Sequence, residues 1–261
     1  MTTGSILFNT PSYVICIILL GLIFLFYILG TIVGYHQKLK RPIAKADGVG
    51  PLENALLGLL ALLLSFTFSM SSSRHDKRTS LVIEEANDIS TAILRADLYP
   101  DSIRKVFRED LKLYVESRIA YNDAGLNENK IKQNLDEAEK ISARIWATAA
   151  NATKNSNLAM PHSVMAPALN SMMDAVTSRK AARVARVPDL IMWLLIILNL
   201  LGSFTIGYAK NERQKDWIIL SIYAIMTVAT IFAIMDLDRP SRGIITTKEY
   251  TDKIVELRKM L

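Results

Sequence analysis

The sequence predicts an all-α membrane protein with four transmembrane helices and an extramembrane helical block between the second and third spans. Of the 261 residues, 51% are hydrophobic, and they concentrate in charge-free runs near the two ends of the chain. This distribution excludes a single soluble globule and a disordered chain. The charged residues, 21% of the chain, lie mainly between those runs. There the apolar residues recur every three or four positions, which is typical of helices.

The apolar runs are long enough to span a membrane, because about 20 residues in a helix cross a hydrocarbon core of about 30 Å. We expect the four spans at about residues 12–35, 52–73, 188–209 and 217–235. The first run is too long for a signal peptide, and no Lys or Arg precedes it. Pro188 and Asp189 suit the first turn of the third span.

These spans divide the chain into four parts. We expect a first transmembrane pair in 1–73, a helical soluble block in 74–187, a second transmembrane pair in 188–236 and a C-terminal segment in 237–261.

The block itself reads as a series of helices. No Gly or Pro occurs between residues 59 and 99, so the second span is predicted to continue to about residue 98, roughly 70 Å at 1.5 Å per residue. Pro100 stops this helix, and Asp101 is expected to cap the next one. The following helices are expected to reach Gly125 and to cover about 128–153 and 163–187.

The net charge of +6 is explained by Lys and Arg residues that flank the spans, where they contact lipid headgroups. We therefore expect membrane lipids as partners and no nucleic acid. A small excess of these cations on the side of the middle block favours an inner or plasma membrane with the block in the cytoplasm. The opposing cations lie in the short loops 36–51 and 210–216, which weigh more in that rule and leave the orientation open.

No motif for catalysis occurs, so we expect no enzyme and no cofactor. The three histidines are isolated, Cys16 is the single cysteine, and phosphate-binding or nucleophile-elbow motifs are absent from the sequence. A membrane-embedded enzyme would need polar groups inside the spans, and Asn199 is the one deep amide, expected to bond to a neighbouring helix. Asp236 and Asp238 are weak metal candidates, because calcium needs more oxygen ligands than two and Arg239 offers a salt bridge.

The second span carries the most informative pattern. Five residues at steps of three or four share one broad helical face: Leu59, Leu62, Phe66, Ser69 and Ser73. If several subunits turned this face to a common axis, the two larger apolar side chains, Leu62 and Phe66, would form a neck that gates by dewetting, and the two serines would line a vestibule.

Three cations follow this face and would raise the anion concentration at the mouth of such a pore: Arg74, Lys77 and Arg78. The alternative is that the face simply packs against neighbouring helices or lipid.

Several motifs together resemble the bestrophin-like domain family, over about residues 48–245. They are the runs 50–53 and 58–69, the Arg74-x-x-x-Arg78 pair, the runs 84–92 and 94–97, Tyr114 with Arg118, and Asp236-x-Asp238-Arg239-Pro240-x-x-Gly243. This family is distantly similar to the bestrophins, which are pentameric anion channels with four spans per subunit and a cytosolic helical region. The resemblance therefore implies a bestrophin-like fold and a homo-oligomer, expected to be a pentamer.

In the bestrophins the second span lines a hydrophobic neck, and an arginine follows the last neck phenylalanine by eight residues. Phe66 and Arg74 have that separation here. The third neck position is Gly58, His75 replaces a tryptophan, and the calcium-binding acidic cluster of animal bestrophins is reduced to Asp236 and Asp238.

Two functions are compatible with these features. The first is a homo-oligomeric channel that passes small inorganic anions such as chloride along the second span. The alternative is a non-conducting membrane scaffold or sensor that binds a partner through its helical block. The adaptable side chains of a methionine-rich surface would suit that role: Met165, Met172 and Met173.

Overall fold

The computed structural model describes residues 7, 10–40, 49–154, 156–209, 217–239, 244–245 and 248–261. Throughout these ranges the regular structure is helical, and no strand occurs. Four stretches in them are long and apolar enough to cross a membrane, within Ser12–Gln37, Gly50–Ala96, Ala159–Ala209 and Trp217–Asp238. The four predicted spans lie within these stretches.

The loop cations on which the orientation argument depends fall largely in 41–48 and 210–216, outside the described residues.

The chain divides into two compact units. The membrane unit consists of Met1–Ser73 and Arg186–Arg239, and the helical unit consists of Arg74–Ala185 and Pro240–Leu261. The helix α3 (Val49–Ala96) contributes to both. It runs without a break, as the lack of glycine and proline between residues 59 and 99 predicts.

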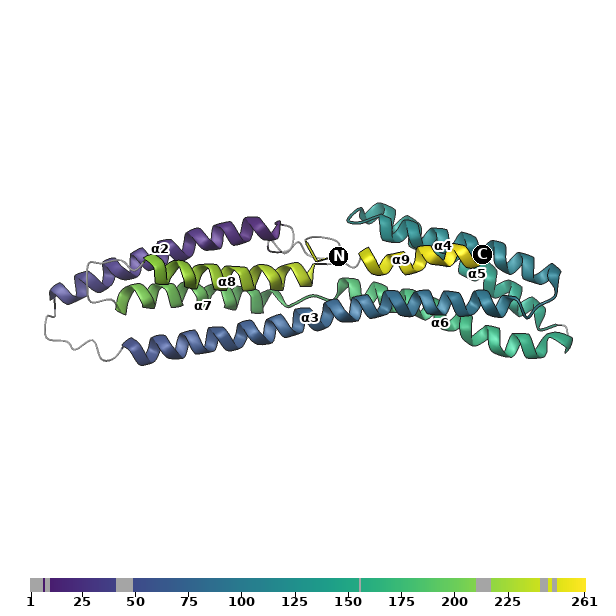
Figure 1. Ribbon diagram of the computed structural model, residues 1–261, viewed down its shortest axis with the longest axis horizontal. Coiled ribbons are helices and arrows are strands. Elements are labelled where there is room, and N and C mark those ends of the chain that lie inside the picture. The colour runs from purple at the N-terminus through teal and green to yellow at the C-terminus, as the bar shows by residue number, and fades with distance from the viewer. Residues whose placement is uncertain are drawn as a thin grey trace. The chain divides into compact units, whose positions relative to one another are not determined.

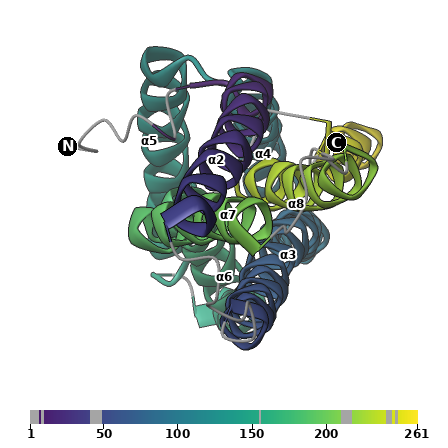
Figure 2. The same cartoon turned by 90° about the vertical axis from the view of Figure 1, so that its left-hand side faces the viewer.

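The membrane unit contains α2 (Ser12–Lys40), the N-terminal part of α3, α7 (Asp189–Ala209) and α8 (Trp217–Asp238). The helices α7 and α8 lie between α2 and the N-terminal part of α3 (Figures 1 and 2). Apolar side chains from all four helices form one core, and its most buried members include Leu19, Ile23, Leu60, Leu195, Leu220 and Ile231.

Glycines allow α2 and α7 to approach closely. A Cβ on Gly30 would lie 2.2 Å from the carbonyl oxygen of Phe204, and one on Gly207 would lie 2.3 Å from that of Tyr27. Gly34 faces Tyr208 in the same way. Gly30 and Gly34 form a G-x-x-x-G pattern, which lets transmembrane backbones pack together without intervening side chains. This contact was not anticipated, although its sequence signature is present.

The helical unit contains the C-terminal part of α3, α4 (Asp101–Asp123), α5 (Glu128–Ala152), the short η2 (Ser156–Leu158), α6 (Ala159–Val184), α9 (Lys248–Glu256) and η3 (Leu257–Met260). A shared core is built from the apolar stripes of these helices, with Ile89, Phe107, Leu111, Ile145 and Met165 completely buried. Gly125 has φ of 54°, a left-handed conformation that glycine adopts without strain, and it turns the chain from α4 towards α5.

Two predicted helix boundaries need correction. Pro100 is the N-cap of α4, and Asp101 lies in the first turn paired with Arg104 instead of capping the helix. The helix α6 begins at Ala159, earlier than expected, because Pro161 falls in the first turn, where the missing N–H costs no helical hydrogen bond. It ends at Val184 because Ala185 is extended, and Pro188 keeps the preceding residue out of the α region.

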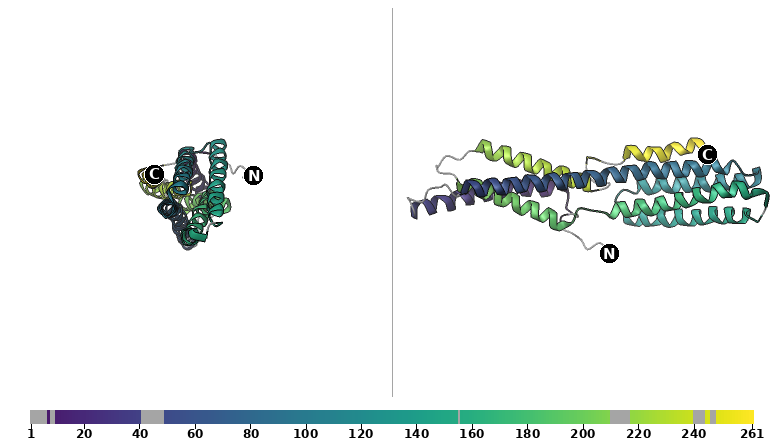
Figure 3. Two further views of the ribbon diagram at one scale, coloured as in Figure 1. Left: turned by 90° about the vertical axis from the view of Figure 1, so that its right-hand side faces the viewer. Right: turned by 90° about the horizontal axis from the view of Figure 1, so that it is seen from below.

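The C-terminal segment packs onto the helical unit, with α9 alongside α4 (Figure 3). Ile254 and Leu257 are buried in its core. Arg258 donates to both carboxylate oxygens of Glu116 at 2.7 and 2.6 Å, which lowers the pKa of that carboxyl. Arg108 donates to the carbonyl of Met260 at 2.9 Å. Polar and apolar contacts together therefore hold this segment in place.

Gly30→Ala should destabilise the membrane unit by about 1–3 kcal/mol, because the new methyl group meets the backbone of α7 rather than a movable side chain. The thermal unfolding midpoint of the detergent-solubilised protein measures this. Gly21→Ala on the same helix is the control, since no atom lies within 4 Å of the new Cβ. Equal midpoints for the two variants would contradict the close α2–α7 contact.

Candidate functional site

The predicted stripe on α3 lies on an exposed face. Leu59, Leu62 and Phe66 are 45%, 52% and 63% exposed. Ser69 and Ser73 continue the exposed line towards the C-terminal half of the helix. The five side chains therefore point away from the other helices of the membrane unit. That they line a pore stays a prediction.

The opposite face of α3 fixes this orientation. Leu60, Leu64 and Thr67 are buried, and Ser71 is completely buried. Rotating the helix to bury Phe66 would expose this set. The most apolar stretch of α3 also has the lowest share of buried residues among the four candidate spans, 22% compared with 28%, 44% and 39%. Thus α3 is the candidate span that the rest of the chain covers least.

The composition of the exposed face distinguishes α3 from a helix that meets only lipid. On α8 the strongly exposed residues are uniformly apolar and include Ile218, Ile222 and Ile225. On α3 the exposed line changes from leucine and phenylalanine to serine within two turns. Hydroxyl groups in this position suit contact with water or another polar surface better than contact with lipid tails.

The three predicted mouth cations differ in their environment. Lys77 is exposed and Arg74 is half-buried, whereas Arg78 is only 7% exposed. Arg78 donates from Nε to the carbonyl of Ala182 at 3.1 Å and from Nη2 to that of Ala185 at 2.7 Å. The last carbonyls of a helix lack partners within the helix and attract cations. Arg78 therefore caps the C-terminus of α6. That its charge also attracts anions to the mouth of a pore stays a prediction.

One of the two weak metal candidates, Asp238, binds a backbone amide. Asp238 accepts hydrogen bonds from the Val187 amide, with nitrogen–oxygen distances of 3.0 and 3.1 Å. Asp236 is buried, and Arg239 donates to the carbonyl oxygens of Thr10 and Leu7. Within the described ranges, no three His, Cys, Asp or Glu side chains come together as metal ligands.

Asn199 does not make the interhelical bond that was expected. Its side chain is completely buried, and neither Oδ1 nor Nδ2 has a hydrogen-bond partner in the described part of the chain. Its backbone carbonyl accepts from the Tyr223 hydroxyl at 3.0 Å. No catalytic partner for this amide is therefore in place among the residues that the structure describes.

The methionines of α6 are core residues rather than a binding surface. Met165 and Met172 are completely buried, and Met173 packs against the same cluster while half-buried. The helical spacing that suggested a stripe was correct, but the stripe faces inward.

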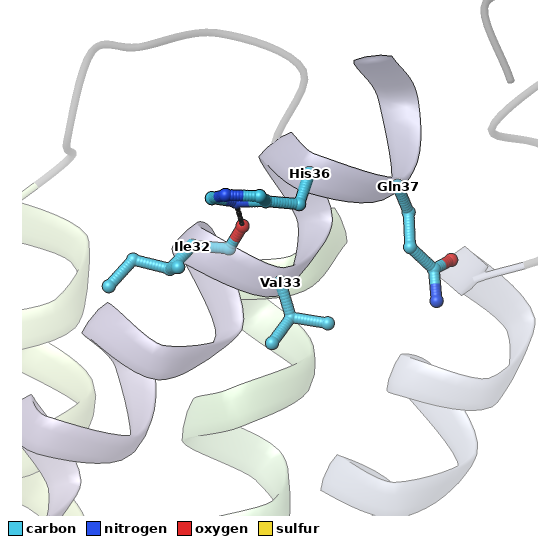
Figure 4. A pocket seen from close by; sticks show the side chains of 4 residues that line it. All are labelled: Ile32, Val33, His36 and Gln37. Atoms are coloured by element: carbon cyan, nitrogen blue, oxygen red, sulfur yellow. Dashed lines mark hydrogen bonds between the residues drawn. The ribbon is translucent and has the colours of Figure 1, made fainter. Parts of the chain in front are cut away.

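A pocket on α2 offers little chemistry. It is lined by Ile32, Val33, His36 and Gln37 (Figure 4). The Nδ1 atom of His36 lies 2.9 Å from the carbonyl oxygen of Ile32, and Gln37 accepts from the Tyr208 hydroxyl at 2.6 Å. Both polar side chains already have partners, and no second ionisable group lines the pocket.

The helical unit also contains a buried charge cluster whose role the sequence did not reveal. Glu85 of α3 is paired with Arg118 of α4 and Arg179 of α6, and both Glu85 and Arg118 are 0% exposed. Tyr121 lies against this group, 4.4 Å from the Arg118 guanidinium to the ring centroid. Burial is the largest influence on Arg118 and opposes its charge, but the Glu85 carboxylate, together with Tyr114 and Tyr121, raises the pKa of Arg118, which stays charged.

Comparison with known proteins gives one match. A family described as Bestrophin-like domain matches residues 13–250. No curated protein and no solved structure matches the chain. The match covers more than half of the chain and includes the last three candidate spans and all but the first residue of the first.

Arg78→Met should lower the stability of the helical unit by about 2 kcal/mol, because two charge-assisted hydrogen bonds to α6 are lost from a buried position. Lys77→Met is the matched control, since Lys77 is exposed and its removal should change stability by less than about 0.5 kcal/mol. Thermal unfolding midpoints of the two variants would distinguish a structural arginine from a surface cation. If both variants match the wild type, the capping role of Arg78 is wrong.

Proposed function

Because the chain belongs to the bestrophin-like domain family, we propose that it assembles as a homo-oligomeric ion channel whose pore is lined by α3 of each subunit. The observation that carries this proposal is the exposed line of α3. It presents Leu59, Leu62 and Phe66, continues through Ser69 and Ser73, and is directed away from the subunit's own core.

The apolar part of the line supplies a gate. A constriction ringed by leucine and phenylalanine offers an ion no replacement for its hydration shell, so it closes by dewetting and opens when it widens. Phe66 has the most exposed side chain of the three apolar residues and forms the narrowest ring of this pore.

The assembly is needed because one subunit provides only one wall of such a pore. The low burial of α3 within its own subunit leaves its outer face available for copies of itself. The family relationship to bestrophins supports a pentamer in an inner or plasma membrane, with the helical unit in the cytoplasm. Lys77 and Arg74, which follow the serines along α3, attract anions to the mouth, and chloride is the small anion proposed to permeate.

A non-conducting scaffold is the competing function, and it loses its main support. Of the methionines that would have formed its adaptable surface, Met165 and Met172 are completely buried and Met173 is half-buried. A failed conduction experiment would favour the scaffold function.

Phe66→Ala should increase the anion current of the purified protein in planar bilayers several-fold, because it removes the bulkiest ring from the proposed neck. Phe68→Ala is the matched control. It removes the same side chain from the same helix, is also exposed at 43%, and lies two residues away on a different face.

The control variant should conduct as the wild type does. Silent bilayers with well-folded protein, or currents that respond equally to the two substitutions, would contradict the channel proposal.

A further inference from the structure

The buried face of α3 repeats after five helical turns. At about 3.6 residues per turn, two residues eighteen positions apart point in the same direction from a helix. Three buried residues of the membrane unit have buried counterparts at this spacing in the helical unit: Leu64 and Val82, Thr67 and Glu85, and Ser71 and Ile89. The helix is unbroken between them. The same side of α3 is therefore buried in both units, although each unit covers it with its own helices.

The exposed line of α3 continues in the same way. The residues eighteen positions after its five members are all polar: Lys77, Ser80, Glu84, Asn87 and Thr91. The first four are exposed and the last is half-buried. Glu84 is the counterpart of Phe66. A helix that turns Phe66 towards a central axis therefore turns Glu84 towards the same axis, roughly 27 Å further along.

The charge close to Glu84 on this side of the helix is negative. Glu84 is exposed and forms no ion pair in the described part of the chain. Asp88 follows one turn later and is half-buried, and the charges that act on it are those of Glu84 and Glu85. Glu85 itself belongs to the buried face, where Arg118 and Arg179 pair with it. Those two guanidinium groups are thus already engaged by another carboxylate.

The cations of α3 lie too far from Glu84 to neutralise it. Arg74 and Lys77 precede it by at least seven residues, roughly 10 Å along the axis, and Asp76 beside Lys77 carries the opposite charge. Arg95 follows Glu84 by eleven residues. At physiological ionic strength, exposed charges more than about 8 Å apart are largely screened from each other. Each subunit therefore keeps a local negative potential at the level of Glu84.

We propose that Glu84 faces the pore axis and that its copies form a ring of carboxylates, which lowers the permeability of anions relative to cations. Acidic rings act in this way because they attract cations and repel anions. The ring opposes the attraction of anions by Lys77 and Arg74, so the wild-type channel is expected to conduct sodium as well as chloride. This inference rests on the proposed pore and adds the residue that limits its anion selectivity.

Glu84→Gln keeps the length of the side chain and removes its charge. In planar bilayers with a sodium chloride gradient, it should shift the reversal potential towards the equilibrium potential of chloride and raise the chloride-to-sodium permeability ratio several-fold. Glu84→Lys should shift the reversal potential further in the same direction. Both shifts should become smaller as the ionic strength rises, because salt screens the ring.

Glu139→Gln is the matched control. Glu139 is an exposed carboxylate of the same unit, but it lies on α5, which packs against α4 and α6. This variant should keep the wild-type reversal potential. Currents that flow with an unchanged reversal potential in both Glu84 variants would overturn the ring and leave the pore intact. Silent bilayers of well-folded wild-type protein would contradict the pore itself, and the ring with it.

Glu84→Cys tests the orientation of this position directly. A thiol that faces the ion pathway is open to charged methanethiosulfonate reagents, and the added charge then acts on the passing ions. A positively charged reagent should shift the reversal potential towards chloride, and a negatively charged one should shift it towards sodium. The wild type and Glu139→Cys serve as controls, since the single native cysteine, Cys16, is buried. A reversal potential that neither reagent changes in Glu84→Cys would show that the residue faces away from the pathway.

Discussion

The rotational setting of α3 about its own axis is the constraint on which the account of the membrane unit depends. Leu60, Leu64 and Ser71 are buried on one side of the helix, and this forces Leu62 and Phe66 to the other. A helix has only one such setting for a given buried face. The exposed line from leucine to serine is thus a direct consequence of how the four helices pack, and the pore is proposed from what that line would meet in a homo-oligomer.

A second constraint acts in the helical unit, where Glu85 is shared by Arg118 and Arg179. It links residues of α3, α4 and α6 through buried charge rather than apolar packing alone. Removing one partner of such a pair leaves an uncompensated charge in the interior, so the three helices are held in one register.

The sequence predicted the features that depend on composition and period. Charge-free runs located the four spans, and the absence of glycine and proline predicted the unbroken α3. The sequence did not reveal the features that depend on which distant helix a side chain contacts. Met165 has the correct helical period, but which way its stripe faces depends on helices distant in sequence. Likewise, Glu85 and Arg118 are 33 residues apart, and nothing in either local pattern indicates that they meet.

The most direct test of the central claim is the symmetry of the purified assembly in electron micrographs, together with the position of α3 in it. The account predicts a ring of identical subunits, expected to be five, in which Phe66 of each α3 faces the central axis. Isolated single subunits, or an assembly in which the Phe66 side chains face the surrounding detergent or lipid, would contradict it.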